Sequence, residues 1–365
     1  MDSLGKERCW AEIDLAAVRH NAHVARERSG AETELLAIVK ANAYGHGIRQ
    51  IAEALRTEAG LFGVANLQEA IELRESGIEK PILILGPALP EERAAIVRRG
   101  FIASVSSAAE AHAFAPGVTI DFVVDTGMGR MGCWEEEAVA EMETVAQMAE
   151  VNLHSVSTHL PVADEDANFT EEELARFQKL VRYLRARVPG AWKAHVLLSA
   201  GILGFPQHRF EMVRAGLMLY GSSPMPNEQR LLHPVMTLKS RVALLRELPA
   251  GRSVSYGRTF ITPRPMRVAT ISAGYADGFP RALSNRDAAV LIGGQRCPVL
   301  GRITMDLTMV DVSALSEVQL GDEVVLFGKQ GSEEILAAEV AERAGTIAWE
   351  IFTGVGSRVR RVYGQ

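Results

Sequence analysis

The sequence predicts an α/β fold in which an N-terminal (β/α)8 TIM barrel is followed by a mostly-β C-terminal domain. Between residue 14 and about residue 221, eight short and almost continuously apolar runs alternate with segments of helical periodicity. Such runs are typical of strands buried on both faces of a parallel sheet, and eight repeats over about 200 residues fit a closed barrel. Beyond about residue 234, strand-like runs are separated by turn residues. A doubly wound open sheet is the second interpretation.

The expected barrel opens with a helix over residues 15–30, which has helical apolar spacing and ends at a glycine. The eight expected strands cover residues 35–40, 61–66, 81–86, 101–106, 119–126, 153–160, 194–200 and 213–221. Further helices are expected at residues 49–60, 67–77, 90–100 and 170–188.

The C-terminal part differs in its predicted secondary structure, because only residues 333–345 have a helical pattern there. Its strands are expected at residues 236–248, 253–260, 267–275, 288–301, 307–313 and 322–328. We therefore predict a cofactor-binding barrel over residues 11–233 and a β-rich domain over residues 234–365. The N-terminal residues 1–10 are expected to belong to the β-rich domain.

Composition excludes several classes of function. Hydrophobic residues make up 47% and charged residues 23% of the 365 residues, as in ordinary globular proteins. The net charge of -6 argues against a nucleic-acid or anionic-membrane surface. The cysteines Cys9, Cys133 and Cys297 lack metal-ligand spacing, and no apolar run could span a bilayer. We expect a cytoplasmic protein with free thiols and no metal.

Polar residues fall where catalytic groups of a barrel are expected, at the carboxyl ends of the strands. Lys40, Arg130, His159 and Ser199 each follow or lie at the end of a different predicted strand, and Arg214 lies at the eighth. Taken singly, each has an ordinary structural interpretation: a solvated lysine, a glycine-rich turn, a hydrogen-bonded histidine or a helix cap. Their shared placement favours a site.

The chemistry of this set suggests pyridoxal phosphate. A lysine at an apolar barrel mouth has its charged form disfavoured, and a neutral amine forms Schiff bases with carbonyl groups. Backbone N–H groups at glycines and helix starts, with the hydroxyls of Tyr44 and Ser199, suit a phosphate. Arg214 would then face the pyridine nitrogen and His159 would pack against the ring.

Seven motifs together resemble the alanine racemases, which are fold-type III pyridoxal-phosphate enzymes. They are AIVKANAYGHG, VDTGMGRMG, STHLPVADED, VRAGLMLYG, VSYGRTF, GYADGFPR and GRITMD, and they occur in family order over nearly the whole chain. The resemblance implies interconversion of L- and D-alanine, which supplies D-alanine for peptidoglycan. It also implies a homodimer with shared active sites.

The resemblance also assigns roles to residues. It implies that Lys40 is the Schiff-base lysine and one of two bases, and that Tyr256 is the opposing base, borrowed from the partner subunit. Two bases on opposite faces of Cα racemise a substrate without turning it over. The implied cofactor contacts are Lys40, Tyr44, His159, Ser199, Arg214, Gly216 and Leu217. The implied substrate contacts are Arg130 and Met305, and the implied entrance corridor is formed by Asp164, Tyr275, Arg281, Arg302 and Asp306.

The sequence departs from the family pattern at several positions. Val123 stands where many members carry a carbamylated lysine that holds the arginine of the GMGR motif. Leu198 stands where an asparagine is common, and Ser357 where a tyrosine often contacts the phosphate. None of these departures touches Lys40 or Tyr256, so activity is expected.

Two alternatives remain open. A racemase with broader or shifted preference, such as for serine, differs from an alanine racemase only in pocket size. A non-catalytic pyridoxal-phosphate carrier is the alternative from another class, and the β-rich domain that carries Tyr256 argues against it.

Overall fold

The computed structural model describes residues 7–114 and 116–364, which form two compact units. The barrel unit comprises residues 18–43 and 48–233. The β unit comprises residues 7–17, 44–47 and 234–364. None of the helices in these residues has the length and apolar character needed to cross a membrane.

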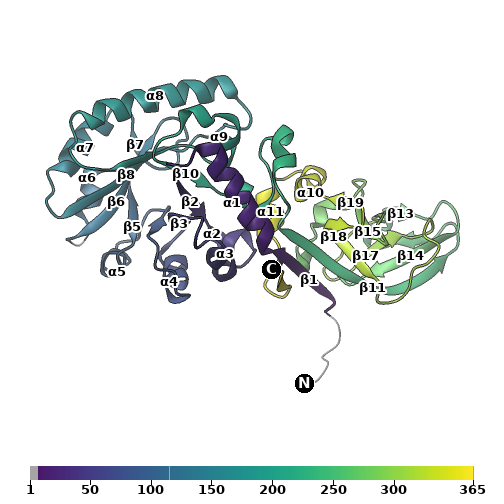
Figure 1. Cartoon of the computed structure of the whole chain (residues 1–365). Coiled ribbons are helices and arrows are strands. Elements are labelled where there is room, and N and C mark those ends of the chain that lie inside the picture. The colour runs from purple at the N-terminus through teal and green to yellow at the C-terminus, as the bar shows by residue number, and fades with distance from the viewer. Residues whose placement is uncertain (1–6, 115, 365) are drawn as a thin grey trace. The chain divides into compact units, whose positions relative to one another are not determined.

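The barrel unit contains a closed parallel barrel of eight strands in its described part, as predicted (Figure 1). The strands pair in the order β2–β3–β4–β5–β6–β8–β9–β10, and pairing of β10 with β2 closes the ring. Their bounds are β2 (Glu34–Ile38), β3 (Leu61–Val64), β4 (Ile82–Ile84), β5 (Ile102–Val105), β6 (Val118–Asp125), β8 (Val151–Ser157), β9 (Lys193–His195) and β10 (Met212–Ala215). A two-residue strand, β7 (Cys133–Trp134), extends the sheet beside β6.

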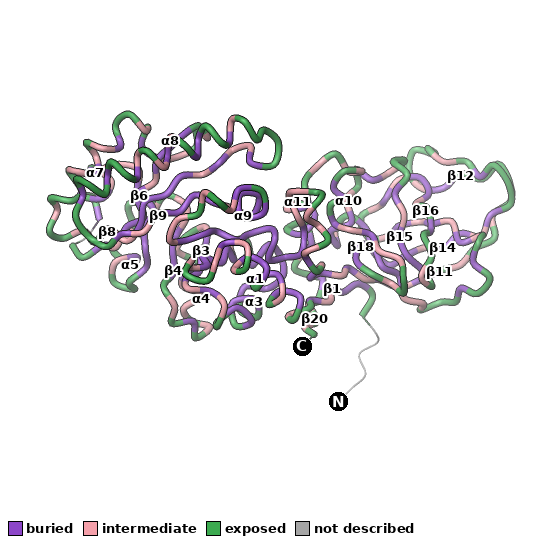
Figure 2. Tube along the Cα trace, turned by 45° about the horizontal axis from the view of Figure 1, so that its top comes forward, coloured by how far each residue is buried: buried purple, intermediate pink, exposed green. Residues whose placement is uncertain are grey.

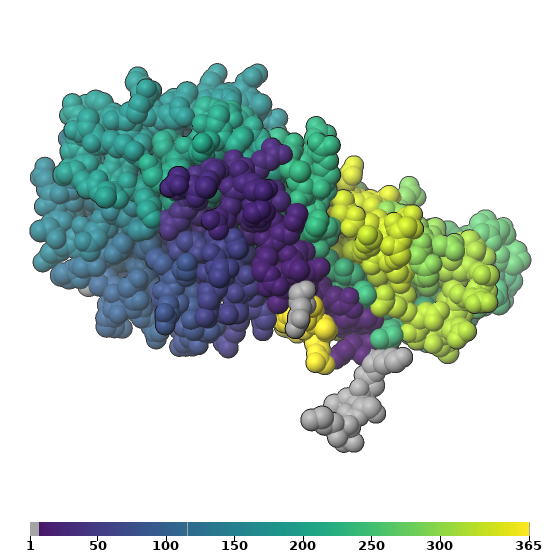
Figure 3. Space-filling model, viewed as in Figure 1, coloured from purple at the N-terminus to yellow at the C-terminus, as the bar shows by residue number. Residues whose placement is uncertain are grey.

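Helices surround the barrel strands. They are α1 (Leu15–Ser29), α2 (Lys40–Tyr44), α3 (Ile48–Ala54), α4 (Leu67–Glu75), α5 (Arg93–Arg98), α6 (Ala108–His112), α7 (Ala138–Ala146), α8 (Ala167–Arg185) and α9 (Ser199–Gly204). Three short 3-10 helices follow, η1 (Pro206–His208), η2 (Leu217–Tyr220) and η3 (Pro226–Leu231). Figure 2 shows the strands mostly buried, whereas the helices alternate between buried and exposed faces. Figure 3 shows α1 on the visible surface of this unit.

Burial explains why most of these strands are rich in apolar residues. Every residue of β3, β4, β5 and β10 is buried, because side chains on one face fill the barrel and those on the other meet helices. The predicted strand at 213–221 was too long. It ends at Ala215, and Leu217–Tyr220 forms η2, whose buried side chains had the same apolar pattern as a strand.

The β unit is built on a mostly antiparallel sheet whose central strand, β11 (Met236–Leu248), alternates buried and less buried residues along its first half. The other strands are β1 (Cys9–Asp14), β12 (Ser253–Val254), β13 (Phe260–Ile261), β14 (Met266–Ile271), β15 (Ala289–Ile292), β16 (Gln295–Pro298), β17 (Thr308–Asp311), β18 (Glu323–Gln330), β19 (Glu333–Ile335) and β20 (Arg360–Gly364). Its helices are η4 (Tyr256–Arg258), η5 (Tyr275–Asp277), η6 (Arg281–Leu283), α10 (Ala337–Ala344) and α11 (Ala348–Thr353).

Strand β1 corrects the predicted start of the barrel at residue 11. It pairs antiparallel with β11 and parallel with β20, so residues 11–17 belong to the β unit. Residues 7–10 also lie in the β unit, and residues 1–6 lie outside the described residues. Helix α11, which has six residues and no side-chain cap hydrogen bond, was not predicted from the sequence.

Candidate active site

The barrel unit carries five of the predicted site residues at or just beyond the carboxyl ends of its strands. Arg214 lies within β10, Lys40 lies two residues beyond β2, and His159 two residues beyond β8. Ser199 begins α9, four residues after β9, and Arg130 lies five residues after β6. The parallel barrel therefore places all five side chains at the same end of the unit, where barrel enzymes carry their active sites.

Lys40 has the electrostatic surroundings that a nucleophilic amine requires. Burial lowers the pKa of its ammonium group below the usual 10.5, and the positive charges of Arg130 and Arg214 lower it further. The Glu69 carboxylate opposes this shift. Because the neutral amine is the reactive form, these surroundings increase the reactive fraction near neutral pH.

The backbone after Lys40 is left-handed. Ala41, Asn42, Ala43 and Tyr44 all have φ between 50° and 53°. Each non-glycine residue in this region costs on the order of 1 kcal/mol. The turn is held by the Asn42 side chain, which accepts the Ile48 N–H at 2.8 Å, and by Glu69, which accepts the Ala41 N–H at 2.7 Å. A strained segment beside a reactive lysine is typical of functional sites.

Arg214 is a buried cation whose guanidinium group is fixed by backbone carbonyls. Its Nη2 donates to the carbonyl oxygen of Thr158 and, at 2.9 Å, to that of Val196. Burial lowers the pKa of this guanidinium to about 10, and Arg130 adds to the effect while Asp121 opposes it. Its Nε is buried and has no hydrogen-bond partner among the described residues. An acceptor is required at that position.

His159 is held in its neutral form. Burial lowers the pKa of its imidazole to about 2, with further contributions from the nearby positive charges of Arg214, Arg130 and Lys40. Protonation of this ring would add a fourth cation to a partly buried cationic cluster. The site at the barrel mouth therefore suits an anionic ligand, with the neutral ring available for packing.

Ser199 organises the backbone next to β10. Its buried hydroxyl oxygen accepts the N–H groups of Gly216 at 3.0 Å and Met218 at 3.3 Å. These bonds join the start of α9 to the start of η2, where Gly216 and Leu217 lie. Backbone N–H groups that gather at helix starts form the type of cradle that binds phosphate.

These barrel residues fit pyridoxal phosphate. The unpaired Nε–H of Arg214 is a fixed donor for a pyridine nitrogen, and Lys40 can bond covalently to an aldehyde. The Ser199 and Gly216 region is suited to the phosphate group. A donor at the ring nitrogen cannot act as an acid at neutral pH, since arginine keeps its proton.

Tyr44 lies at the end of the left-handed turn, in the β unit. Its phenol is buried, and burial raises its pKa to about 12, while a hydrogen bond with the Trp349 side chain opposes the shift. The phenol therefore stays protonated and remains a hydrogen-bond donor. Trp349 belongs to α11, the helix that was not predicted from the sequence.

Tyr256 is the more exposed of the two predicted catalytic residues, with 71% of its surface accessible. It begins η4, between residues of unusual backbone conformation: Ser255 has φ of 63° and Arg258 of 50°. Ser255 Oγ donates to the Arg302 carbonyl, and the Arg302 guanidinium lies so close to Gly257 that a Cβ there would be 2.7 Å from Nη1. The strained segment is thus fixed while the phenol projects into solvent.

Met305 lies on the same unit, at a tight backbone contact. The carbonyls of Thr304 and Met305 accept the N–H groups of Tyr275 at 3.1 Å and Ala276 at 3.0 Å. A Cβ on Gly274 would lie 2.2 Å from the Thr304 oxygen, so only glycine fits this contact. The side chains of Met305 and Tyr275 are exposed by 53% and 40%.

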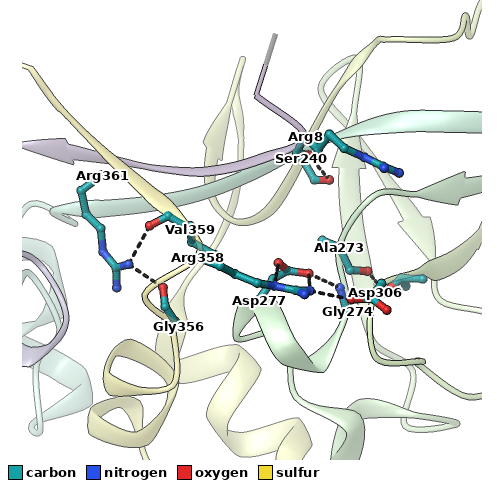
Figure 4. Close-up of polar contacts among 11 residues, drawn as sticks. Arg8, Ser240, Ala273, Gly274, Asp277, Asp306, Gly356, Arg358, Val359 and Arg361 are labelled. Atoms are coloured by element: carbon teal, nitrogen blue, oxygen red, sulfur yellow. Dashed lines mark hydrogen bonds and ion pairs between the residues drawn. The ribbon is translucent and has the colours of Figure 1, made fainter. Parts of the chain in front are cut away.

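Two of the predicted corridor residues are fixed by ion pairs or close packing, as Figure 4 shows for Asp306. Arg358 forms a bidentate pair with Asp277, with both N–O distances 2.8 Å, and also contacts Asp306 at 2.9 Å. Asp277 in turn accepts the Gly274 N–H at 2.9 Å. Arg302 packs on Gly257. Asp164 of the barrel unit and Arg281 of the β unit are exposed.

The positions that depart from the family pattern have clear local surroundings. Val123 is a half-buried residue of β6, and the loop that follows is held instead by Asp125, whose Oδ1 accepts the N–H groups of residues 127, 128 and 129 at 2.9–3.1 Å. Leu198 is half-buried at the start of α9, and Ser357 is exposed. Arg130 is therefore carried by a loop that a carboxylate caps.

A buried polar network in the barrel interior was not predicted from the sequence. Asp121 accepts the hydroxyls of Ser155 and Ser157, both at 2.7 Å, and lies 3.1 Å from His195 Nε2. These contacts hold the pKa of Asp121 below its usual value despite burial, so a negative charge lies near Arg214. The signal was present in the sequence, because Asp121 interrupts the apolar residues in the middle of β6.

The chain combines a closed parallel barrel, which has a lysine just after its first strand, with a mostly-β domain. This combination indicates a barrel enzyme whose active site lies at the carboxyl ends of the strands. Comparison with known proteins identifies the family. The N-terminal domain of alanine racemase matches residues 13–224, and the C-terminal domain of alanine racemase matches residues 235–363. The chain belongs to the alanine racemase family, whose members are pyridoxal-phosphate-dependent isomerases.

Individual relatives agree over the full length. The alanine racemase of Methylacidiphilum infernorum is 40% identical over 98% of this chain and 92% of its own. The crystal structure of alanine racemase from a D-cycloserine-producing Streptomyces lavendulae has a TM-score of 0.91 at 36% identity, with 99% and 98% of the two chains covered. The Bacillus anthracis alanine racemase, solved with bound L-Ala-P, has a TM-score of 0.90 at 32% identity, with 99% and 96% covered.

Proposed function

We propose that this protein interconverts L- and D-alanine with two bases, Lys40 and Tyr256 of the partner subunit, around a bound pyridoxal phosphate. The observation that carries the proposal is the pairing of Lys40, whose pKa is lowered by burial, with Arg214, whose buried Nε has no partner among the described residues. One supplies a reactive amine, and the other a fixed donor for a ring nitrogen.

Pyridoxal phosphate, when bound, withdraws electrons from Cα and so makes the Cα proton removable. The residues proposed to hold it are Lys40 at the aldehyde, Arg214 at the pyridine nitrogen and His159 against the ring. The phosphate contacts would come from Tyr44, Ser199, Gly216 and Leu217. Arginine at the ring nitrogen leaves that nitrogen unprotonated, which limits electron withdrawal into the ring and disfavours side reactions such as transamination.

The chain's own bases then control the stereochemistry. Lys40 Nζ takes or returns the Cα proton on one face of the substrate, and Tyr256 Oη of the partner subunit does so on the other. His159 cannot replace either base, because its pKa of about 2 makes it a very weak proton acceptor. The neutral ring instead contributes to packing.

The exposure of the β-unit residues supports a homodimer with shared sites. Tyr256, Met305 and Tyr275 are among the exposed large hydrophobic side chains of the described residues. A partner's barrel mouth would cover them. In this arrangement Arg130 and the backbone of the partner subunit's Met305 bind the substrate carboxylate. Asp164, Tyr275, Arg281, Arg302 and Asp306 form the corridor through which the amino acid enters.

The organisation of the chain follows from this chemistry. The proposed boundary near residue 233 separates a barrel that supplies most of the cofactor contacts, with Tyr44 as the exception, from a β domain that serves the partner. A cytoplasmic enzyme of this kind supplies D-alanine for peptidoglycan.

The test is proton exchange with chiral analysis. L-Alanine and L-serine are incubated separately with the protein and pyridoxal phosphate in deuterated water. Deuterium at Cα together with D-alanine, formed faster than D-serine, is the expected result. Faster formation of D-serine would assign a serine preference, and bound cofactor without exchange would indicate a carrier. Either of those results would contradict the proposal.

A further inference from the structure

Glu173 is a fully buried carboxyl group that the proposed mechanism does not use. It lies on α8, which contacts Thr126 and Gly127 at the start of the loop that carries Arg130. Its Oε1 accepts the hydroxyl of Thr126 at 3.1 Å, while its Oε2 is buried without a hydrogen-bond partner among the described residues. A buried carboxyl oxygen without a partner is costly, so its retention calls for an explanation.

The loop beside Glu173 is shaped around this carboxyl group. Gly127 has φ of 156°, and a Cβ there would lie 2.9 Å from Glu173 Oε1. One turn along α8, Arg176 donates to the Thr126 carbonyl at 2.6 Å and to the Glu135 carboxylate at 3.1 Å. The start of the Arg130 loop is therefore held by α8 through both its backbone and a side chain.

A hydrogen-bond chain leads from Glu173 to the other side of the site. Thr126 Oγ1 lies 2.8 Å from Thr158 Oγ1, and both hydroxyls are buried. Thr158 immediately precedes His159, and its carbonyl accepts from Arg214 Nη2. The chain thus connects the loop of Arg130 with the segment that carries His159 and holds Arg214.

We propose that Glu173 is a positioning residue, which acts through Thr126 and Thr158 on the relative placement of Arg130 and His159 and thereby on binding of the substrate carboxylate. The proposal rests on the proposed function, because Arg130 acquires its role there. Glu173 itself touches neither substrate nor cofactor in this account.

The protonation state of Glu173 fixes the direction of the chain. A hydroxyl has one proton to donate, so when the carboxylate accepts from Thr126, Thr158 must donate to Thr126. When the carboxyl is protonated at Oε1, it donates to Thr126 and the chain reverses. The bond to the ionised carboxylate is the stronger one, since charge-assisted hydrogen bonds exceed neutral ones.

The surroundings of Glu173 place its change of protonation state near neutral pH. Burial raises the pKa of Glu173 from 4.5 to about 7, and the carboxylates of Asp125 and Glu135 also raise it. The Thr126 hydrogen bond and the positive charge of Arg176 oppose the shift. Because the folded-state pKa is raised, the protonated carboxyl of Glu173 contributes to the free energy of unfolding. This contribution is fully present below about pH 4.5 and is lost as the pH rises through about 7.

The experiment compares the wild-type holoenzyme with Glu173→Gln, which mimics the neutral carboxyl group. The control is Glu172→Gln, the same change at the exposed neighbouring position. KM and kcat for L-alanine and the inhibition constant of propionate, a simple carboxylate, are measured at about pH 6 and about pH 8.5. At the higher pH we expect E173Q to bind propionate and L-alanine about fivefold more weakly than wild type, with kcat changed less.

At the lower pH, where Glu173 is mostly protonated, the two proteins should agree, and E172Q should match wild type throughout. Equal affinities at both pH values, or a difference that persists at the lower pH, would overturn the proposal. Thr126→Val should remove the same pH dependence, and Thr126→Ser should restore it. A general loss of stability alone would not produce this split between KM and kcat.

A second measurement separates this inference from the proposed function. The thermal midpoint of the cofactor-free protein should fall more between about pH 5 and about pH 8 in wild type than in E173Q. If wild type fails to racemise alanine, the proposed function is wrong, whereas the propionate and stability measurements still report on Glu173. If wild type racemises alanine but the two proteins show identical pH profiles, only the Glu173 inference is wrong.

Discussion

The barrel unit and the β unit present their site residues in opposite ways. In the barrel unit, Arg214 and Ser199 are exposed by only 7% and 4%, and their hydrogen bonds are made within the unit. In the β unit, Tyr256 and Met305 are exposed by 71% and 53% on firmly held backbone. The barrel residues are therefore surrounded by their own unit, whereas Tyr256 and Met305 are exposed in the single chain, as the proposed shared site requires.

This difference has an electrostatic consequence. The pKa values of Lys40, His159 and Arg214 are all lowered by burial before any partner is present. Tyr256, by contrast, is 71% exposed in its own chain. We therefore expect substitutions in the barrel to act on cofactor and catalysis together, and substitutions at the exposed residues to act on catalysis alone.

Lys40→Ala is expected to have the largest effect. Without the amine, one base and the covalent link to the cofactor are lost together, so turnover should fall by at least about a thousandfold. Racemisation is followed by chiral analysis, and the covalent link by the cofactor's visible absorbance. Lys80→Ala, which removes another lysine of the barrel unit, is the control. Substantial activity without Lys40 would remove the basis of the mechanism.

Tyr256→Phe should separate the two units. Loss of the phenol removes one base, so proton abstraction from one enantiomer should fall by about a hundredfold or more and that from the other far less. Cofactor absorbance should be unchanged, because the barrel residues remain. Isotope exchange from L- and D-alanine measures the asymmetry. Tyr183→Phe, on the exposed face of α8, is the matched control, and equal losses for both enantiomers would argue against a face-specific role.

Mixing the two inactive variants sharpens the comparison further. In a heterodimer of Lys40→Ala and Tyr256→Phe chains, one site combines an intact lysine with the other chain's intact tyrosine. Random reassociation makes half of the dimers mixed, with one working site of two, so about a quarter of wild-type activity should return. Each variant mixed with itself is the control. If both bases came from the same chain, no activity would be restored.

The sequence predicted the barrel well because its signals are local and repeated. Most barrel strands are rich in apolar residues, and the rim residues lie at or just after the ends of such runs. Lys40, His159 and Arg214 could therefore be placed from chain order alone. The β unit was harder, since β1 enters its sheet from the far end of the chain by pairing with β11 and β20. No local pattern marks such long-range pairing.

Other features depended on three-dimensional contacts. The left-handed turn at Ala41 runs against the intrinsic preference of alanine and exists because Glu69 and Asn42 hold it. The proton-sensitive surroundings of Glu173 were also hidden, because the residue reads as one of three consecutive glutamates at the start of a helix. Only packing against the Arg130 loop distinguishes it from its neighbours.

The smallest expected effects concern the ion pairs of the β unit. Asp277 is buried and accepts from Arg358 through both oxygens, whereas Asp306 is exposed and accepts through one. Asp277→Asn should lower the free energy of unfolding by about 1 kcal/mol, and Asp306→Asn by less than about 0.5 kcal/mol, since exposed pairs contribute little. Denaturant unfolding of the cofactor-free protein measures both.

This order depends on desolvation rather than on the number of charges. High salt should weaken the Asp306 contribution more than that of Asp277, because solvent-exposed pairs are screened over about 10 Å at moderate ionic strength. Asp164→Asn, an exposed residue of the barrel unit, is the control for loss of one negative charge. Equal destabilisation by the two β-unit variants would mean that the carboxylates share Arg358 equally. The bidentate contact with Asp277 would then not be the main ion pair that stabilises the η5 segment, which carries Tyr275.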